Sequence, residues 1–245
     1  MNQPLTGFTD IHCHMLPACD DGPADLDESL KMACCYAEAG VREVIATPHH
    51  IPGTAWALPA EQVRAKVEIL RQAVKKRGLD LTIHSGMEIA LHKNIERGLD
   101  SGTLLSLAES DYYLLEPDFH GLSNDIFDAI HLFQTRHKKV VLAHPERVRI
   151  FQNCPEKLVK LVRQDLVQVQ VNMGSLLGRF GNDARKTALL LHRNNSIHYL
   201  ASDAHGAERR RPPTPALWAK LGKAVGERLE TYCITHPNQL VNPPG

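Results

Sequence analysis

Seven runs of apolar and β-branched residues recur along the chain, spaced by roughly 30 residues, and they predict strands. Near-continuous apolar runs of this kind are typical of strands buried on both faces of a parallel sheet. The runs begin near Phe8, Glu43, Leu81, Tyr112, Val140, Val167 and Ile197.

Helical periodicity fills the segments between these runs. Residues 26–37 place their apolar side chains on one stripe, and Asp25 with Glu28 forms the cap pair expected ahead of such a helix. A second stripe is followed by three basic residues and Gly78, which predict a helix end. That second stripe covers residues 63–74, and the remaining helices are expected at 124–138, 183–194 and 215–240.

The alternation of strands and helices predicts an α/β fold with a parallel sheet covered by helices. For 245 residues, closing that sheet into a barrel is the economical arrangement. Seven units are present where the standard barrel has eight, so we expect a distorted (β/α)7 TIM-like barrel. No linker-like stretch divides the chain, and residues 1–245 are expected to form a single domain.

Histidines and carboxylates collect where the predicted strands end. His12 and His14 alternate at the end of the first strand and therefore share one face, and the same spacing recurs at the end of the last strand. In a parallel barrel the carboxyl ends of all strands lie on one face, where active sites are built. The residues expected to meet there are His12, His14, Asp21, His49, Glu88, Glu116, His144, Asp203 and His205.

These five imidazoles and four carboxylates are too polar a set for a core and too many ligands for one ion. Mixed nitrogen and oxygen ligands suit Zn, Mn or Fe. A carboxylate such as Glu88 can bridge neighbouring ions, as multi-metal hydrolytic sites require. A single H-x-H pair is more often structural than ligating, so the prediction of a metal site depends on several strand ends carrying such groups at once.

Net charge, apolar runs and cysteine spacing exclude several classes of protein. The chain has 28 Lys+Arg and 28 Asp+Glu, and this zero net charge argues against a nucleic-acid partner. No apolar run is long enough to cross a bilayer and the first residues do not resemble a secretion signal, so we expect a cytoplasmic protein without membrane insertion. The six cysteines form no C-x-x-C pair and are expected to be free thiols. None is followed six residues later by an arginine, which excludes a cysteine-based tyrosine phosphatase.

The motifs D-I-H-C-H-M-L-P…D-D-G, A-T-P-H-H, G-M-E-I, L-A-H-P-E-R, Q-V-N-M-G-S-L-L-G and A-S-D-A-H resemble the polymerase and histidinol phosphatase (PHP) family. They are most similar to its capsular-polysaccharide tyrosine-phosphatase branch, the CpsB/CapC type. The match runs from about Asp10 to about Pro213, in the same order and on the same elements. The resemblance implies a distorted (β/α)7 barrel with a trinuclear metal centre, commonly manganese-dependent in this branch.

The resemblance also implies how the ligands divide among three ions. The first ion would take His12, His14, Glu88 and Asp203, the second Glu88, Glu116 and His144, and the third Asp21, His49 and His205. Asp203 and His205 are therefore expected to take part in catalysis as well as metal binding. Arg147 matches a phosphate-binding arginine of the branch. A second such arginine lies among Arg209, Arg210 and Arg211, and adjacency to Pro212 favours Arg211.

The activity implied by the resemblance is metal-dependent hydrolysis of phosphotyrosine by attack of a metal-bound hydroxide. The expected substrate is the tail of a bacterial tyrosine kinase that controls capsule or exopolysaccharide synthesis. Three divalent ions are expected, with Mn favoured and with Zn, Fe and Co compatible with the same ligands. His50, His120 and a metal-bound water are left open as groups that could assist the leaving group. The oligomeric state is left open.

Three alternatives share parts of this pattern. A small-molecule phosphomonoesterase such as histidinol phosphatase would keep every metal ligand. A metal-dependent amidohydrolase also has H-x-H on its first strand, although the third ligand set and the arginines fit phosphate better. A catalytically silent binding module of the same fold is the alternative from another class. We further hypothesise that the loop 53–59, with Trp56, borders the mouth of the site and contacts a peptide substrate.

Overall fold

A computed structural model describes residues 7–120 and 123–242 of the chain. Its strands follow the seven predicted runs, and every strand pair is parallel. The strands are β1 (Phe8–Cys13), β2 (Val41–Ala46), β3 (His49–His50), β4 (Thr82–Ser85), β5 (Glu88–Ala90), β6 (Tyr112–Glu116), β7 (Lys139–Ala143), β8 (Gln168–Asn172) and β9 (Tyr199–Ala201).

Two of the predicted runs are each divided into two short strands. The second run becomes β2 and β3 because Pro48 lies between them and has no N–H to donate to a neighbouring strand. The third becomes β4 and β5 at Gly86, where a Cβ atom would lie 2.9 Å from the side chain of Ile45. Close packing therefore explains the glycine at this break.

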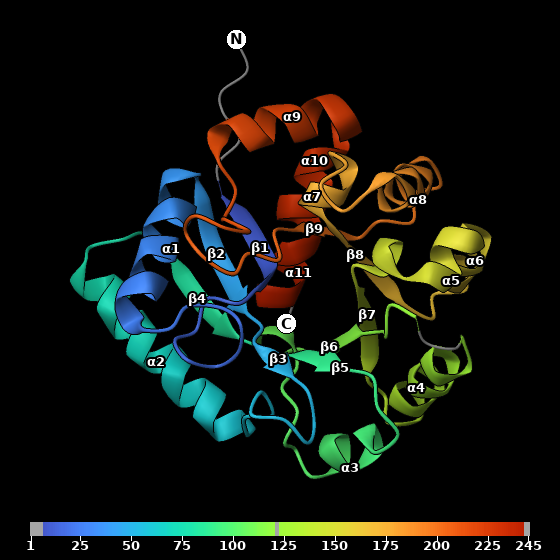
Figure 1. Ribbon diagram of the computed structural model, residues 1–245, viewed down its shortest axis with the longest axis horizontal. Coiled ribbons are helices and arrows are strands. Elements are labelled where there is room, and N and C mark those ends of the chain that lie inside the picture. Colours follow the sequence, from blue (N-terminus) through green and yellow to red (C-terminus); the bar gives the residue numbers. More distant parts are fainter. Residues whose placement is uncertain (1–6, 121–122, 243–245) are drawn as a thin grey trace.

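The strands form two sheets that together make a distorted ring. One sheet has the order β1-β2-β4 and the other the order β3-β5-β6-β7-β8-β9. The segment after β9 returns to β1, because Asp203 N donates to His12 O at 3.0 Å and His14 N donates to Ala204 O at 2.8 Å. This arrangement confirms the predicted TIM-like α/β fold with parallel strands. Figure 1 shows most helices on the outside of the strands, with the C-terminal helix near the middle of the view.

Helices connect successive strands, as the periodicity predicts. The short helices α3, α5, α6 and α7 were not expected from the sequence. The helices are α1 (Leu26–Glu38), α2 (Ala60–Lys76), α3 (Ile95–Asp100), η1 (Leu107–Glu109), α4 (Ser123–Thr135), η2 (Pro145–Arg147), α5 (Arg149–Asn153), α6 (Pro155–Arg163), α7 (Met173–Leu176), α8 (Asn182–Arg193), α9 (Pro215–Val225), α10 (Arg228–Glu230), η3 (Thr231–Thr235) and α11 (His236–Val241).

The predicted cap pair at the start of α1 is confirmed. Asp25 Oδ1 accepts a hydrogen bond from Glu28 N at 2.9 Å, and Glu28 Oε2 accepts one from Ala24 N at 2.8 Å. These two bonds satisfy N–H groups that the first turn of a helix leaves unpaired. The carboxylate of Glu28 is thereby committed to the helix start.

The apolar residues form a large cluster and a small one. The small cluster includes Ile11, Ile45, Leu114, Val141 and Tyr199, which come from strands around the whole ring. Side chains from non-adjacent strands can meet only inside the ring, so this cluster is the barrel interior. In the described part of the chain, no helix has the length and apolar character needed to span a membrane.

Candidate metal centre

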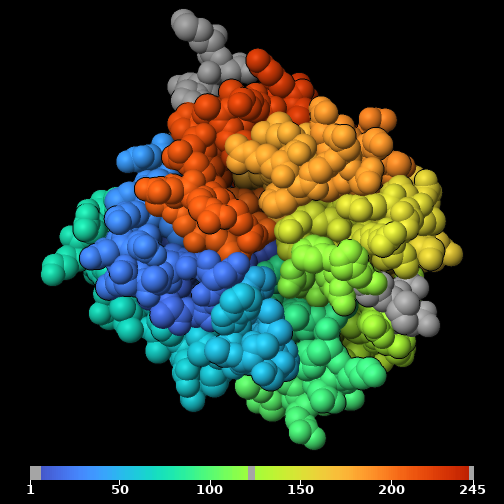
Figure 2. Space-filling model, in the orientation of Figure 1, coloured from blue at the N-terminus to red at the C-terminus, as the bar shows by residue number. Residues whose placement is uncertain are grey.

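All nine predicted ligands come together at the carboxyl ends of the strands. Their donor atoms fall into four overlapping groups, and within each group the atoms lie within 4.8 Å of one another. The segments that carry them meet near the centre of one face of the molecule, where Figure 2 shows blue, cyan, green, yellow and orange chain segments converging. The groups are His14-Asp21-His49-His205, His12-Glu88-His144, His12-His14-Asp203 and His49-Glu88-Glu116.

Glu88 lies at the middle of this metal centre and is fully buried. Its Oε1 is 3.2 Å from His12 Nε2 and 2.9 Å from His144 Nε2. Its Oε2 is 3.2 Å from His14 Nε2 and 2.9 Å from His49 Nδ1. Burial alone would raise the pKa of Glu88, but the surrounding imidazoles, His12 first, hold that pKa well below its usual range. The carboxylate is therefore anionic and faces four imidazoles, as a bridging ligand must.

The group around Asp21 lies at the edge of the centre. Asp21 Oδ1 is 3.1 Å from His205 Nε2 and 3.6 Å from His49 Nε2. His49 turns its other nitrogen, Nδ1, toward Glu88 and, at 3.8 Å, toward Glu116. Because His49 faces both groups, the division of ligands among individual ions stays a prediction.

The donor set fits divalent metal ions. Among the described residues, the buried atoms Glu88 Oε2, His49 Nδ1 and His205 Nε2 form no hydrogen bond, although each lies within 3.1 Å of an oppositely charged or polar atom with which the angles are unsuitable. Leaving such atoms buried without partners is costly, and a coordinated cation removes that cost. Burial lowers the pKa of His205 to about 3, so its imidazole is neutral and offers a lone pair.

Two ligands have left-handed backbone conformations. The φ angle is 31° at His144 and 53° at Asp203. Positive φ is uncommon for residues other than glycine, and such strain concentrates at functional sites. His144 directly follows β7 and Asp203 lies two residues after β9, where the backbone must redirect the side chain into the centre.

Two polar residues outside the predicted set orient its histidines. Asp20 Oδ2 is 2.7 Å from His14 Nδ1 and also accepts a hydrogen bond from His49 N at 2.8 Å. Gln170 Oε1 is 3.0 Å from His12 Nδ1. Partners at Nδ1 leave the Nε2 atoms of both rings facing the centre. The D-D-G and Q-V-N motifs contain both residues, but their spacing alone does not separate a ligand from its supporting group.

Two arginines, one in η2 and one in the loop after β9, form ion pairs with Asp203. Arg147 Nη1 donates to Asp203 Oδ2 at 3.2 Å, and Arg210 Nη2 lies 2.6 Å from Asp203 Oδ1. The guanidinium of Arg147 is held between two aromatic rings, 4.7 Å from the centroid of Phe119 and 4.4 Å from that of Phe180. These cation–π contacts fix the orientation of a side chain that would otherwise be mobile.

The structure corrects the choice of the second arginine. Arg211 is exposed and lies beside the thiol of Cys35, away from the metal centre, and Arg210 takes the expected place. A hydrogen bond from His205 N to Arg210 O and a positive φ of 46° at Arg210 turn the loop in this direction. Neighbouring residues of a turn point different ways, so adjacency to Pro212 was a poor guide.

Trp56 borders the centre, as hypothesised. Its ring stacks on that of His49, with centroids 5.5 Å apart and an interplanar angle of 11°. Contact with a peptide stays a prediction. His50 is buried and His120 is exposed, and neither belongs to the four ligand groups.

These features define a barrel whose strand ends carry a multi-metal site with two arginines beside it. The family described as capsular polysaccharide synthesis, CpsB/CapC, matches residues 8–242. The chain is 35% identical to the tyrosine-protein phosphatase YwqE of Bacillus subtilis (strain 168) over 232 residues, which cover 95% of this chain and 90% of that protein. It is 31% identical to the putative tyrosine-protein phosphatase CapC of Staphylococcus aureus, over 92% of this chain and 88% of that protein. The chain therefore belongs to the CpsB/CapC family.

Solved structures agree with this assignment. The structure reported for YwqE from Bacillus subtilis and CpsB from Streptococcus pneumoniae, described as unique metal-dependent tyrosine phosphatases, matches with a TM-score of 0.88 and 33% identity, covering 97% of this chain and 95% of that chain. A histidinol phosphate phosphatase from Lactococcus lactis matches with a TM-score of 0.60 and 13% identity, over 91% of this chain and 95% of that chain. The second match shows a common fold alone. The predicted membership of the CpsB/CapC branch is confirmed.

Proposed function

We propose that this protein is a metal-dependent phosphatase that hydrolyses phosphotyrosine in proteins. The observation that carries the proposal is the convergence of nine ligands around Glu88, with Arg147 and Arg210 both reaching Asp203 at its edge. The names of the relatives at 35% and 31% identity support the same activity.

We propose that the centre holds three divalent ions, with Mn favoured. Zn, Fe and Co are compatible with the same imidazole and carboxylate ligands. The first ion would be held by His12, His14, Glu88 and Asp203, the second by Glu88, Glu116 and His144, and the third by Asp21, His49 and His205. When bound, such ions activate water and neutralise charge on phosphoryl oxygens.

The arginines bind the phosphoryl group in this proposal. Guanidinium groups match the oxygens of phosphate in bidentate fashion and carry a permanent charge. Asp203, which pairs with both Arg147 and Arg210, keeps the two side chains at the edge of the metal centre. Charge that develops on the phosphoryl oxygens is then met by donors already in place, which lowers the barrier.

The leaving group explains why no strong general acid is required. Tyrosine has a pKa of about 10, so it leaves as a phenolate far more readily than serine leaves as an alkoxide. His120 is exposed and His50 is buried outside the ligand groups, so neither is assigned this role. We infer that the site favours phosphotyrosine over phosphoserine.

We propose as substrate the phosphorylated tail of a bacterial tyrosine kinase that controls capsule or exopolysaccharide synthesis. The description of the matched family, capsular polysaccharide synthesis, supports this partner. We also propose that the protein acts in the cytoplasm. All six cysteines are free thiols in the structure, which suits a reducing compartment.

The test is steady-state hydrolysis of a phosphotyrosine peptide after metal removal and addition of Mn²⁺. A phosphoserine peptide of the same sequence and histidinol phosphate serve as competing substrates. His144→Ala should abolish turnover, and His131→Ala, an exposed histidine on α4, should not. Turnover of histidinol phosphate alone would make the protein a small-molecule phosphatase. No turnover by metal-loaded protein would favour a silent binding module.

A further inference from the structure

Two amide side chains of β8, Gln170 and Asn172, are fully buried beside the metal centre. They alternate along the strand, so both project from the same face of the sheet. Gln170 Nε2 donates a hydrogen bond to Asn172 Oδ1 at 2.8 Å, and Asn172 Nδ2 donates one to Asp203 Oδ2 at 2.7 Å. The two amides therefore connect β8 to a predicted metal ligand that follows β9.

The hydrogen bonds of these amides can run in only one direction. The backbone N–H of His144 donates to Gln170 Oε1 at 3.1 Å, and a main-chain N–H cannot accept. The other polar atom of that amide, Nε2, must then donate to Asn172 Oδ1, which leaves Asn172 Nδ2 as the donor to Asp203. An ionised carboxylate only accepts hydrogen bonds, so both ends of the chain require the same direction.

The backbone of Asn172 is anchored as well. Its N–H donates to Glu146 Oε1 at 3.1 Å, and the same oxygen accepts a hydrogen bond from Ser175 Oγ at 2.6 Å. Glu146 is itself fully buried. Because the N, Oδ1 and Nδ2 atoms of Asn172 all have partners, the amide is held in one orientation.

The two oxygens of Asp203 have different surroundings. Oδ2 accepts hydrogen bonds from Asn172 Nδ2 at 2.7 Å and from Arg147 Nη1 at 3.2 Å. Oδ1 instead lies 3.5 Å from His14 Nε2 and 3.7 Å from His12 Nε2. One oxygen is therefore committed to hydrogen-bond donors, and the other faces the imidazoles of the metal centre.

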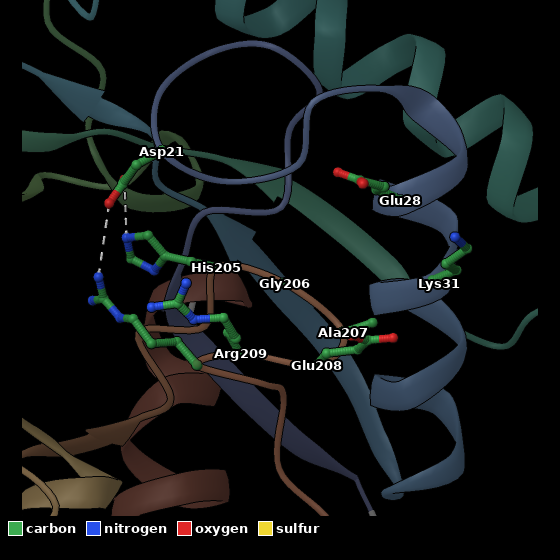
Figure 3. Close-up of a pocket in the computed structure, with 9 residues that line it drawn as sticks. Asp21, Glu28, Lys31, His205, Gly206, Ala207, Glu208 and Arg209 are labelled. Atoms are coloured by element: carbon green, nitrogen blue, oxygen red, sulfur yellow. Dashed lines mark ion pairs between the residues drawn. The ribbon is translucent and has the colours of Figure 1, made fainter.

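The remaining neighbours of Asp203 leave Oδ1 able to bind a cation. Arg210 Nη2 lies 2.6 Å from Oδ1, but a carboxylate oxygen has about two lone pairs, so one stays free. His205 turns its Nε2 toward Asp21 at 3.1 Å, as Figure 3 shows. Its Nδ1 lies 3.0 Å from the main-chain oxygen of Asp203, so the hydrogen on Nδ1 is directed to that carbonyl rather than to Oδ1.

We propose that Asn172 is a positioning residue of the metal centre, which commits Asp203 Oδ2 to a hydrogen bond and so leaves Oδ1 for metal binding. The inference rests on the proposed metal-dependent function. It adds a supporting group for Asp203 to those already described for the histidines. Partners of this kind orient a ligand in advance, and their loss weakens metal binding.

The experiment measures the affinity of the folded protein for Mn²⁺ and Zn²⁺ by competition with a metal-binding dye. Asn172→Leu keeps a side chain of similar size but removes the donor to Asp203, and we expect affinity to fall by roughly 10-fold or more. Asn172→Val removes the same donor and suits a strand, so it serves as a second variant if the leucine disturbs folding. Gln152→Leu is the matched control, because Gln152 Nε2 donates to the main-chain oxygen of Glu146 rather than to a ligand.

A double-mutant cycle with Asp203→Ala separates positioning from a general effect on the fold. If Asn172 acts through Asp203, Asn172→Leu should weaken metal binding roughly 10-fold in the wild-type background and less than about 2-fold once the carboxylate is absent. Equal losses in the two backgrounds would overturn the assignment, because Asn172 would then act on the centre by another route.

The outcomes separate this proposal from the proposed function. If the wild type binds no metal and hydrolyses no aryl phosphate, the function fails. If the wild type is active and a folded Asn172→Leu or Asn172→Val variant binds metal as tightly, the function stands and the role of Asn172 is overturned. Lower stability of the metal-free variants without a loss of affinity would likewise make Asn172 a structural residue only.

Discussion

Glu88 Oε1 lies 2.9 Å from His144 Nε2, although the two residues are 56 positions apart in the chain. The parallel ring explains this proximity, because only β6 lies between β5, which begins at Glu88, and β7, which ends directly before His144. The other ligands carried by different strands are brought together in the same way. Function therefore depends on the register of short strands as much as on the ligands themselves.

Asp20→Asn should weaken metal binding without removing a ligand. The carboxylate of Asp20 orients His14 through Nδ1 and accepts a hydrogen bond from His49 N, and an amide cannot hold both in the same way. Loss of such a supporting group typically costs 10- to 100-fold in metal affinity. Competition with a metal-binding dye measures it, with Asp111→Asn, an exposed aspartate, as the control. Unchanged affinity would show that the contact with His14 is incidental.

Arg210→Lys should lower kcat/KM for an aryl phosphate by roughly 10- to 100-fold, because one ammonium group cannot replace a bidentate guanidinium. Arg211→Lys is the matched control and should have little effect, since Arg211 lies beside Cys35. Steady-state measurement of kcat/KM for the two variants shows which of the two arginines acts on the phosphoryl group. A larger loss in Arg211→Lys would restore the expectation drawn from the sequence.

Phe180→Leu should weaken binding of the phosphoryl group by freeing Arg147. The ring of Phe180 lies 4.4 Å from the guanidinium, and Gly174 makes room for it, since a Cβ there would lie 2.8 Å from the ring. A cation–π contact is worth about 0.5–2 kcal/mol, so KM and the inhibition constant of inorganic phosphate should rise by roughly 2- to 30-fold. Phe127→Leu, an exposed phenylalanine on α4, is the control. A fall in kcat at constant KM would point instead to disturbed metal ligands.

His198 should make folding sensitive to acid. Its Nδ1 accepts a hydrogen bond from Val169 N at 3.1 Å, which requires a neutral ring, and burial followed by the nearby His236 lowers the pKa of His198 to about 4. An unfolded histidine takes up a proton near pH 6.5, so the free energy of unfolding should fall as pH drops from about 6.5 to about 4, by up to about 3 kcal/mol from this residue.

The His198→Asn variant keeps an acceptor in the chain but does not titrate in this range. Denaturant unfolding at pH 7.5 and pH 4.5 should show a smaller loss of stability for this variant than for the wild type. Other groups also protonate over this interval, so the difference between the two proteins is the informative quantity. Equal losses would mean that His198 does not control acid sensitivity.

Much of the site could be predicted because one geometric rule applies to all its residues. Alternation places His12 and His14 on one face, and the common direction of parallel strands brings the distant Asp203 to them. Neither inference needs atomic detail. The seven apolar runs were sufficient to order the strands.

Details set by turns could not be predicted. Asp20 and Asp21 are adjacent acidic residues, and only the path of the loop makes one a support for His14 and the other a partner of His205. That path depends on Gly22, where a Cβ atom would lie 2.4 Å from His14 O. Arg210 and Arg211 differ in the same way, through a positive φ that the sequence does not reveal.

The most direct test of the central claim is to measure bound metal and phosphotyrosine hydrolysis together in Glu88→Gln. Because Glu88 faces four imidazoles, the account predicts fewer bound ions per chain than in the wild type and a loss of turnover of at least roughly 100-fold. Glu43→Gln, at a carboxylate that pairs with His84 away from the centre, should match the wild type in both respects. Full activity and full metal content in Glu88→Gln would contradict the account.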